Sequence, residues 1–363
     1  MRLILAGGGT TGHVGPLLAT AAELQRRDPS VELRVVGTAE GIETRLVPAA
    51  GLELVTIPKV PFPRRPDGAA LRFPARFRAA KAQVSALLAE FRPAGVVGFG
   101  GYASPPVYLA AAKAGVPVVV HEANAKPGLA NRLGARRAAA VGVTFPQTQL
   151  PRAELTGMPL RRAIADLDRP TQRAAARAEL GLAADRPTLL VSGGSLGAQR
   201  LNQAVAAVAA DLLAAGAQVL HLTGRGKAEP VAAALTGLAD AQHYHVVEYL
   251  DRMELAFAAA DLAVQRAGAG TVSELACVGL PSVLVPLPIG NGEQRLNAAG
   301  LVAAGGAELV DDAAFPAWAS ANLVDLLSDG ARLAAMAAGA EKVAIRDGAE
   351  RLCGLIERVA VVA

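Results

Sequence analysis

The stretch that decides the fold is at residues 2–16 and reads RLILAGGGTTGHVGP. Residues 3–6 are contiguous apolar residues rather than alternating ones, which predicts a short strand buried on both faces. The glycines at 7–12 allow a sharp backbone turn, and the periodic apolar positions beyond them predict a helix over about residues 16–27. A strand, a glycine turn and a helix in this order are the first unit of a parallel α/β sheet.

The same unit recurs along the chain. Strands are predicted at 33–36, 52–57, 96–99, 118–120 and 139–143, and again at 188–191, 219–222, 245–248, 262–264 and 282–285. The pattern restarts near residue 160, so we expect two α/β Rossmann-like domains whose parallel sheets face a central cleft. The first domain is expected over residues 1–160 and the second over 161–342, with a final helix at about 343–363 that packs back onto the first.

Composition excludes several classes of protein. The 363 residues are 52% hydrophobic and 19% charged, which is typical of a globular chain. The two cysteines exclude a disulfide scaffold and a Cys-rich zinc site, and they fit a reducing cytosol. Too few residues precede the first glycines for the apolar region of a signal peptide. The two longest uncharged windows, 94–112 and 275–292, are broken by glycine and proline, so no membrane-spanning helix is expected.

Charge is distributed unevenly. Residues 1–160 hold 19 Lys and Arg against 10 Asp and Glu, whereas residues 161–363 hold 17 against 22. Residues 59–81 concentrate basic side chains with three interleaved phenylalanines. Such a segment can lie on an anionic lipid surface or bind phosphate, and a solvated loop and helix face is an equal alternative. Nucleic acid is disfavoured because aromatic residues are few and no recognition motif accompanies them.

Four glycine-rich loops follow predicted strands, at 7–12, 98–101, 192–197 and 266–270. Glycine permits close approach of the backbone, and a following helix presents unpaired N–H groups, so such loops can cradle phosphate or a sugar oxygen. The alternative is that they are plain structural connections. The first loop has the spacing of a dinucleotide fingerprint, but Val36-Gly37-Thr38 stands where the ribose-binding acid is expected. A nicotinamide dehydrogenase is therefore disfavoured.

Four side chains are candidates for chemistry. His13 follows the first loop at a predicted helix start, where it could act as a base or bind phosphate, or merely bond to nearby backbone. Glu274 could accept the hydroxyls of a ribose or cap its helix. Gln294 and Asn297 lie three residues apart on one helix face, where they could bind sugar hydroxyls or cap a turn.

Together these motifs resemble the MurG family of bacterial peptidoglycan glycosyltransferases. The matching segments are 8–16, 98–105, 121–124, 193–198, 201–202, 266–274, 279–281, 286–288 and 294–298. They follow in order and at family-like spacing from about residue 2 to about 350. The chain departs from the family pattern at Thr11, Ala123, Met158, Leu196 and 291–293.

The resemblance implies a GT-B-type transferase that takes UDP-GlcNAc as donor. The donor is then expected to contact residues of the second half, namely Arg161, Ser195, Leu250, Ala269, Gly270, Thr271, Val272, Ser273, Glu274, Gln294 and Asn297. Four residues of the first half, on the side expected to bind the acceptor, are expected to contact the donor as well. They are Thr10, Thr11, Gly12 and Asn124. His13 is the expected catalytic base, and the lipid diphosphate is expected near Gly100, Gly101 and Tyr102.

The family reaction moves GlcNAc, with inversion, to the 4-hydroxyl of the MurNAc sugar of lipid I and forms lipid II and UDP. Helix N-termini and Arg161 are expected to stabilise the leaving UDP. No Asp-x-Asp pair is identified that would hold a metal-bound diphosphate, so no metal and no cofactor are expected. The expected partners are UDP-GlcNAc, lipid I, an anionic lipid surface and other cell-wall synthesis proteins, but no nucleic acid. The expected location is peripheral, on the cytoplasmic face of the plasma membrane.

Two other readings stay open. A non-hydrolysing UDP-GlcNAc epimerase shares the two-domain layout and the donor but has no need of a membrane surface. A catalytically dead nucleotide-binding partner of the cell-wall machinery would be a non-enzyme, and the presence of His13, Glu274 and Gln294 disfavours it.

Overall fold

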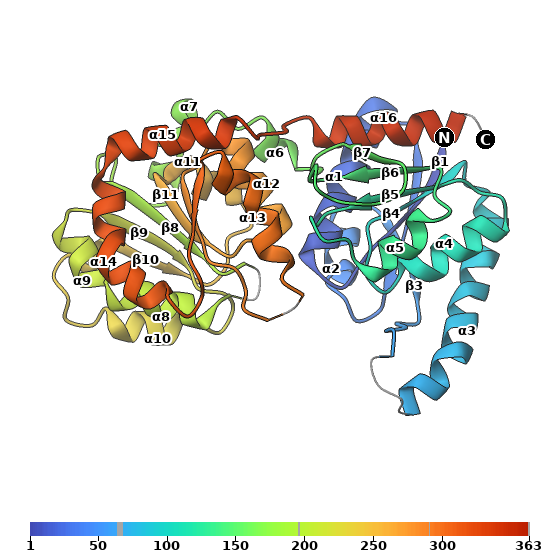
Figure 1. Ribbon diagram of the computed structural model, residues 1–363, viewed down its shortest axis with the longest axis horizontal. Helices are drawn as coiled ribbons and strands as arrows, with labels where there is room; N and C mark the ends of the chain where they lie inside the picture. The colour runs from blue at the N-terminus through green and yellow to red at the C-terminus, as the bar shows by residue number, and fades with distance from the viewer. Residues whose placement is uncertain (64–67, 195–196, 290, 362–363) are drawn as a thin grey trace. The chain divides into compact units, whose positions relative to one another are not determined.

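The computed structural model describes residues 1–63, 68–194, 197–289 and 291–361. The chain divides into two compact units (Figure 1). Unit 1 consists of residues 1–161 and 347–363, and unit 2 of residues 162–346. These divisions lie within a few residues of the boundaries expected from the sequence.

Unit 1 contains a seven-stranded sheet in the order β3-β2-β1-β4-β5-β6-β7, and every neighbouring pair is parallel. Its strands are β1 (Arg2–Ala6), β2 (Glu32–Thr38), β3 (Glu53–Ile57), β4 (Gly95–Gly98), β5 (Val118–Glu122), β6 (Ala140–Val143) and β7 (Ala153–Leu155). Its helices are α1 (Thr11–Arg27), α2 (Glu43–Ala49), α3 (Gly68–Phe91), α4 (Ser104–Lys113), α5 (Leu129–Ala135) and α16 (Gly348–Val361). The strand order reverses between β1 and β4, which brings the loops after these two strands together.

The side chains of β1 alternate between two cores. Leu3 and Leu5 pack with α1 and α16, and Ile4 packs with α3 and α4 on the opposite face. Helix α16 contributes Leu352 and Ile356, both fully buried, to the first of these cores. Each such side chain stabilises the fold by roughly 1.5–3 kcal/mol. The last helix therefore belongs to unit 1, although it follows unit 2 in the sequence.

Unit 2 contains a six-stranded parallel sheet in the order β10-β9-β8-β11-β12-β13. Its strands are β8 (Thr188–Ser192), β9 (Gln218–Leu222), β10 (Tyr244–Val247), β11 (Leu262–Gln265), β12 (Ser282–Leu284) and β13 (Ala307–Leu309). Its helices are α6 (Arg162–Ala165), α7 (Arg169–Glu179), α8 (Gln199–Ala207), α9 (Ala209–Ala214), α10 (Ala228–Ala234), α11 (Met253–Ala259), α12 (Ala269–Val278), α13 (Glu293–Ala303), α14 (Phe315–Ser328) and α15 (Gly330–Glu341), with a 3₁₀ turn η1 at Ala241–His243. The loops after β8 and β11 lie side by side at its reversal point.

The structure corrects the sequence prediction in three places. Strands β7 and β13 were not predicted, because each has only three residues and lies at a sheet edge. Helix α1 begins at Thr11 rather than near residue 16. Its polar first turn is held by hydrogen bonds from the backbone N–H groups of His13 and Val14 to the carbonyl of Thr10, both 3.1 Å. His13 is therefore inside the first turn of α1.

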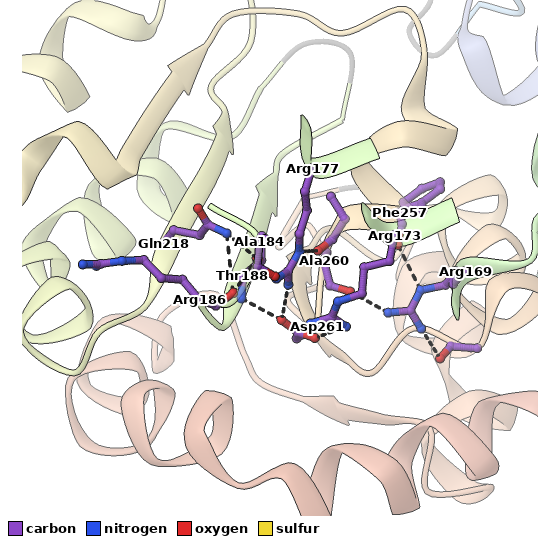
Figure 2. A network of polar contacts seen from close by, with 12 residues as sticks. Arg169, Arg173, Arg177, Ala184, Arg186, Thr188, Gln218, Phe257, Ala260 and Asp261 are labelled. Atoms are coloured by element: carbon purple, nitrogen blue, oxygen red, sulfur yellow. Dashed lines mark hydrogen bonds and ion pairs between the residues drawn. The ribbon is translucent and has the colours of Figure 1, made fainter. Parts of the chain in front are cut away.

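A buried arginine network, which the sequence did not indicate, organises unit 2 (Figure 2). Arg177 of α7 is 1% exposed and donates to the carbonyls of Ala259 and Ala184 and, at 2.9 Å, to Asp261 Oδ2. The same oxygen accepts from the backbone N–H of Thr188 at 2.8 Å, where β8 begins. The network therefore joins α7 to the first residue of β8 and to the residue directly before β11.

Arg169, two helical turns before Arg177 on α7, extends the network (Figure 2). Its guanidinium donates to three backbone carbonyls, at Phe257, Ala260 and Gly279. Burial lowers the pKa of Arg169 to about 10, which still leaves it charged at neutral pH. Gly279 ends α12, so this arginine also holds the far end of that helix.

Candidate functional site

The loops after β1 and β4 in unit 1 are in direct contact. A Cβ on Gly101 would overlap the carbonyl oxygen of Gly8, and the φ of Gly101 is +79°. A Cβ on Gly100 would lie 3.1 Å from Nε2 of His13. Both positions therefore require glycine. The loop with Gly100 and Gly101, which is predicted to bind the lipid diphosphate, lies directly against His13, the predicted base.

The hydrogen bonds of His13 indicate which tautomer its neutral ring adopts. Nδ1 lies 3.1 Å from the carbonyl oxygen of Gly8 and 3.2 Å from Oγ1 of Thr10. A carbonyl oxygen can only accept, so Nδ1 carries the proton and Nε2 presents a lone pair beside Gly100. Nε2 can therefore accept a proton from a substrate hydroxyl.

The charge state of His13 is set by opposing effects. Burial lowers its pKa below 6.5, while the carboxylates of Glu122 and Glu43 and the hydrogen bond to Gly8 act in the other direction. The net shift is downward, so the imidazole is neutral at pH 7 and available as a base.

Glu122, at the end of β5, is a buried carboxylate that organises the loop after this strand. It accepts hydrogen bonds from the backbone N–H of Asn124 at 2.8 Å, from that of Gly128 at 3.0 Å and from Nδ2 of Asn131 at 3.0 Å. Asn131 also accepts from the hydroxyl of Tyr108 at 2.7 Å. Sequence reasoning did not select Glu122 as a site residue, although its position at a strand end was the available signal. Nothing in the sequence indicated Asn131.

The other predicted residues of unit 1 are mostly accessible. Thr10, Thr11 and Gly12 are exposed and Asn124 is half-buried. Tyr102 is 39% exposed, and the ammonium of Lys59 lies 5.7 Å from the centre of its ring. Arg161, at the end of unit 1, is also exposed.

In unit 2 the glycines near the two ends of the loop after β8 are closely packed. A Cβ on Gly193 would overlap the backbone of Ala198, and one on Gly197 would overlap the carbonyl of Thr223. This compact turn leads directly into α8. Ser195, together with Leu196, lies outside the described residues.

Helix α12 begins at Ala269, directly after the loop that follows β11. Its N-cap is Gly268, no side chain caps it, and its first turn has no acidic residue. The predicted residues Ala269, Gly270, Thr271, Val272 and Ser273 make up the first five positions of this helix. Glu274 is the sixth residue and half-buried, whereas a capping box requires an acid at the third, so the capping alternative does not fit.

Gln294 and Asn297 both have structural contacts. Oε1 of Gln294 accepts from the backbone N–H of Leu287 at 2.8 Å. Asn297 is 1% exposed, and its Nδ2 lies 3.4 Å from the carbonyl oxygen of Ala267, just before α12. The two side chains therefore connect α13 to the loops after β12 and β11. Leu250, the predicted uracil contact, is half-buried.

The one Asp-x-Asp sequence near the predicted donor residues, at 166–168, has local partners. Asp166 pairs with Arg162 at 2.9 Å. Asp168 is the N-cap of α7 and accepts from the hydroxyl of Thr171 at 2.6 Å. Both carboxylates therefore have a structural role at the start of unit 2.

Two sequence families match the chain. The glycosyltransferase family 28 N-terminal domain matches residues 3–143, and the glycosyltransferase family 28 C-terminal domain matches residues 188–352. These two matches cover most of both units.

Individual relatives match along almost their whole length. A protein of Clavibacter sepedonicus named UDP-N-acetylglucosamine--N-acetylmuramyl-(pentapeptide) pyrophosphoryl-undecaprenol N-acetylglucosamine transferase is 60% identical over 97% of this chain and 95% of its own. A protein of the same name from Leifsonia xyli subsp. xyli is 58% identical over 97% of each chain. Among solved structures, the crystal structure of Acinetobacter baumannii MurG matches with a TM-score of 0.79 and 27% identity, over 98% of this chain and 99% of that one.

Proposed function

Because the chain belongs to glycosyltransferase family 28, we propose that it transfers N-acetylglucosamine from UDP-N-acetylglucosamine to N-acetylmuramyl-(pentapeptide) pyrophosphoryl-undecaprenol, which is lipid I. The observation that carries this is the 60% identity, over 97% of the chain, to a relative named for that reaction. The resemblance to the MurG family and the α/β fold class with two Rossmann-like domains, both predicted from the sequence, are confirmed.

His13 is proposed as the base. Nε2 would take the proton from the 4-hydroxyl of the MurNAc sugar while that oxygen forms its bond to the anomeric carbon and the bond from this carbon to UDP breaks, with inversion. The tautomer supports this role, because Nδ1–H donates to Gly8 and only Nε2 has a free lone pair. Gly100, Gly101 and Tyr102 are proposed to lie near the lipid diphosphate.

The donor is proposed to bind at the helix N-termini of unit 2. The uncapped start of α12 presents backbone N–H groups suited to a diphosphate, and α8 begins directly after the glycine loop that follows β8. Glu274 would accept the ribose hydroxyls, Gln294 and Asn297 would order the sugar pocket, and Leu250 would contact uracil. The remaining contacts proposed for the donor are those of Arg161, Ser195, Thr10, Thr11, Gly12 and Asn124. The chemistry is proposed to need no metal.

A transfer assay tests the proposed function. Purified protein is incubated with radiolabelled UDP-N-acetylglucosamine and lipid I in detergent, and label is expected in the lipid product together with equimolar UDP. Formation of UDP-N-acetylmannosamine without lipid I would instead indicate an epimerase. Binding of the donor with no turnover would indicate an inactive partner protein. A chelator is expected to leave the rate unchanged, and strict loss of turnover would contradict metal independence.

Replacing Glu274 with alanine is expected to weaken donor binding by about 10- to 100-fold, because hydrogen bonds to a charged group contribute about 1.5–3 kcal/mol. The dissociation constant of UDP-N-acetylglucosamine, measured by calorimetry, reports this effect. The matched control is Glu229→Ala, since Glu229 is an exposed acid in the first turn of α10 and should leave donor binding unchanged. An equal rise in the KM of lipid I would argue for a purely structural role of Glu274.

The basic segment of unit 1 is proposed to bind an anionic lipid surface. Arg72, Arg76 and Arg78 are exposed on α3, and Figure 1 shows the N-terminal part of α3 extending beyond the sheet of unit 1. The ring of Phe73 lies between those of Phe62 and Phe77, with centres 5.6 and 5.5 Å away and the ring planes tilted. No described helix has the length and apolar character needed to cross a membrane. A peripheral location on the cytoplasmic face, with other cell-wall synthesis proteins as neighbours, is part of this proposal.

Reversing the charge of Arg72, Arg76 and Arg78 to glutamate is expected to abolish most vesicle binding at low salt. Each basic residue near an anionic surface contributes about 1 kcal/mol before screening. Cosedimentation with vesicles containing anionic phospholipid measures this, and neutral vesicles and 0.5 M salt are the controls. Binding of the triple variant equal to that of the unchanged protein would contradict the proposed membrane surface.

A further inference from the structure

A buried carboxylate outside the predicted site holds the first glycine loop. Glu43, the first residue of α2, is completely buried. Its Oε2 accepts from the backbone N–H of Gly9 at 2.9 Å. Its Oε1 accepts from both the backbone N–H and the hydroxyl of Thr38, at 2.9 and 2.8 Å, at the end of β2. The carboxylate therefore joins the loop after β1 to the strand beside it.

Three glycines make room for this one side chain. A Cβ on Gly8 or Gly41 would overlap the Glu43 carboxylate, and a Cβ on Gly37 would lie 2.7 Å from its Cγ. Gly8 lies in the loop after β1, Gly37 lies near the end of β2, and Gly41 lies in the turn before α2. A substitution at any of the three would displace the carboxylate or the backbone.

Glu43 is connected to His13 through the loop. Gly9, which donates to Glu43, follows Gly8, whose carbonyl accepts from Nδ1 of His13. The position of that carbonyl determines which ring nitrogen is protonated and where the ring points. Among the described residues, the carboxylates that act electrostatically on His13 are Glu43 from α2 and Glu122 from β5.

We propose that Glu43 is a positioning residue of the transferase: its buried carboxylate holds the Gly8–Gly9 backbone and thereby the tautomer and orientation of His13. The inference rests on the proposed function, in which His13 Nε2 is the base. Burial would raise the pKa of Glu43, but the hydrogen bonds from Gly9 and Thr38 outweigh it and leave the pKa below its usual value. The carboxylate is therefore anionic at neutral pH.

The test is Glu43→Gln. An amide has one acceptor and one donor end, so the N–H of either Gly9 or Thr38 must lose its partner. The expected result is a 10- to 100-fold lower kcat, in line with the cost of a small misplacement of a catalytic group. Loss of the anion also removes one influence that raises the pKa of His13, so the acid limb of the kcat/KM profile should move to lower pH. The dissociation constant of UDP-N-acetylglucosamine should stay the same.

Two further variants separate positioning from stability. Glu43→Asp keeps the charge but shortens the side chain, so kcat should fall while the acid limb stays in place; an unchanged kcat would overturn the proposal, even if Glu43→Gln did not fold. Glu23→Gln is the matched control, since Glu23 is also buried and lies on α1 but pairs with Arg26 and Arg27. The Glu23→Gln substitution should lower thermal stability without moving the acid limb of the kcat/KM profile.

A measurement that needs no turnover completes the test. The ¹⁵N and ¹H signals of His13, assigned by their absence in His13→Gln, report its tautomer and pKa directly. In Glu43→Gln the Nδ1–H form should lose its dominance and the pKa should fall. An unchanged tautomer and pKa would overturn the inference while leaving the transfer activity, and hence the proposed function, intact. Absence of transfer by the unchanged protein would instead refute the proposed function.

Discussion

Replacing His13 with glutamine is expected to lower kcat of the transfer reaction by about 10²- to 10⁴-fold, the usual contribution of a positioned general base. Glutamine can keep a hydrogen bond to the carbonyl of Gly8, but it offers no basic nitrogen beside Gly100. The proton of the acceptor hydroxyl would then lose the base proposed for it. Initial rates at saturating donor and lipid I measure the loss.

The pH profile gives an independent check on His13. Burial lowers the pKa of His13 from its ordinary value, so kcat/KM of the unchanged protein should fall at a lower pH than an ordinary imidazole base would give. This acid limb should disappear in the His13→Gln variant. The matched control is His243→Gln, because His243 lies in the η1 turn of unit 2 and should leave rate and profile unchanged. A His13→Gln variant with a full rate would show that another group is the base.

Replacing Asp261 with alanine is expected to lower the free energy of unfolding of unit 2 by about 3–5 kcal/mol, the usual cost of removing one member of a buried ion pair. The substitution leaves the guanidinium of Arg177, which is 1% exposed, without its carboxylate (Figure 2). The backbone N–H of Thr188 loses its acceptor as well, and Arg173 loses its 2.5 Å ion pair. Urea denaturation followed by circular dichroism measures the change.

The control for Asp261 is on the same helix as Arg177. Glu179 pairs with Arg252 at 2.5 Å, but both side chains are more than half exposed. Exposed pairs of this kind contribute about 0–1 kcal/mol, so Glu179→Gln should change stability little. An equal, small effect of the two substitutions would show that the buried network does not stabilise unit 2. Calorimetry should also place the loss in unit 2, with the unfolding of unit 1 unaffected.

Much of the candidate site followed from local sequence patterns. Contiguous apolar residues before glycines identified β1 and β8, and the reversal of strand order then placed the predicted loops at the carboxyl ends of the central strands. Gly100 and Gly101 were selected from a motif, and the structure places Gly100 beside His13. Ser195, also selected from a motif, lies outside the described part of the chain.

What the sequence determined by itself was the alternation of strands and helices, the glycine turns and the family, because these depend on residues close together in the chain. Only the tertiary structure decided the roles of the buried charges. Glu43 meets Gly9 across 34 positions, and Arg177 meets Asp261 across 84. A buried carboxylate or guanidinium needs partners, and the folded backbone alone determines which distant groups come within hydrogen-bonding reach. The protonation of His13 depends on one such arrangement, so it could not be predicted from the local sequence.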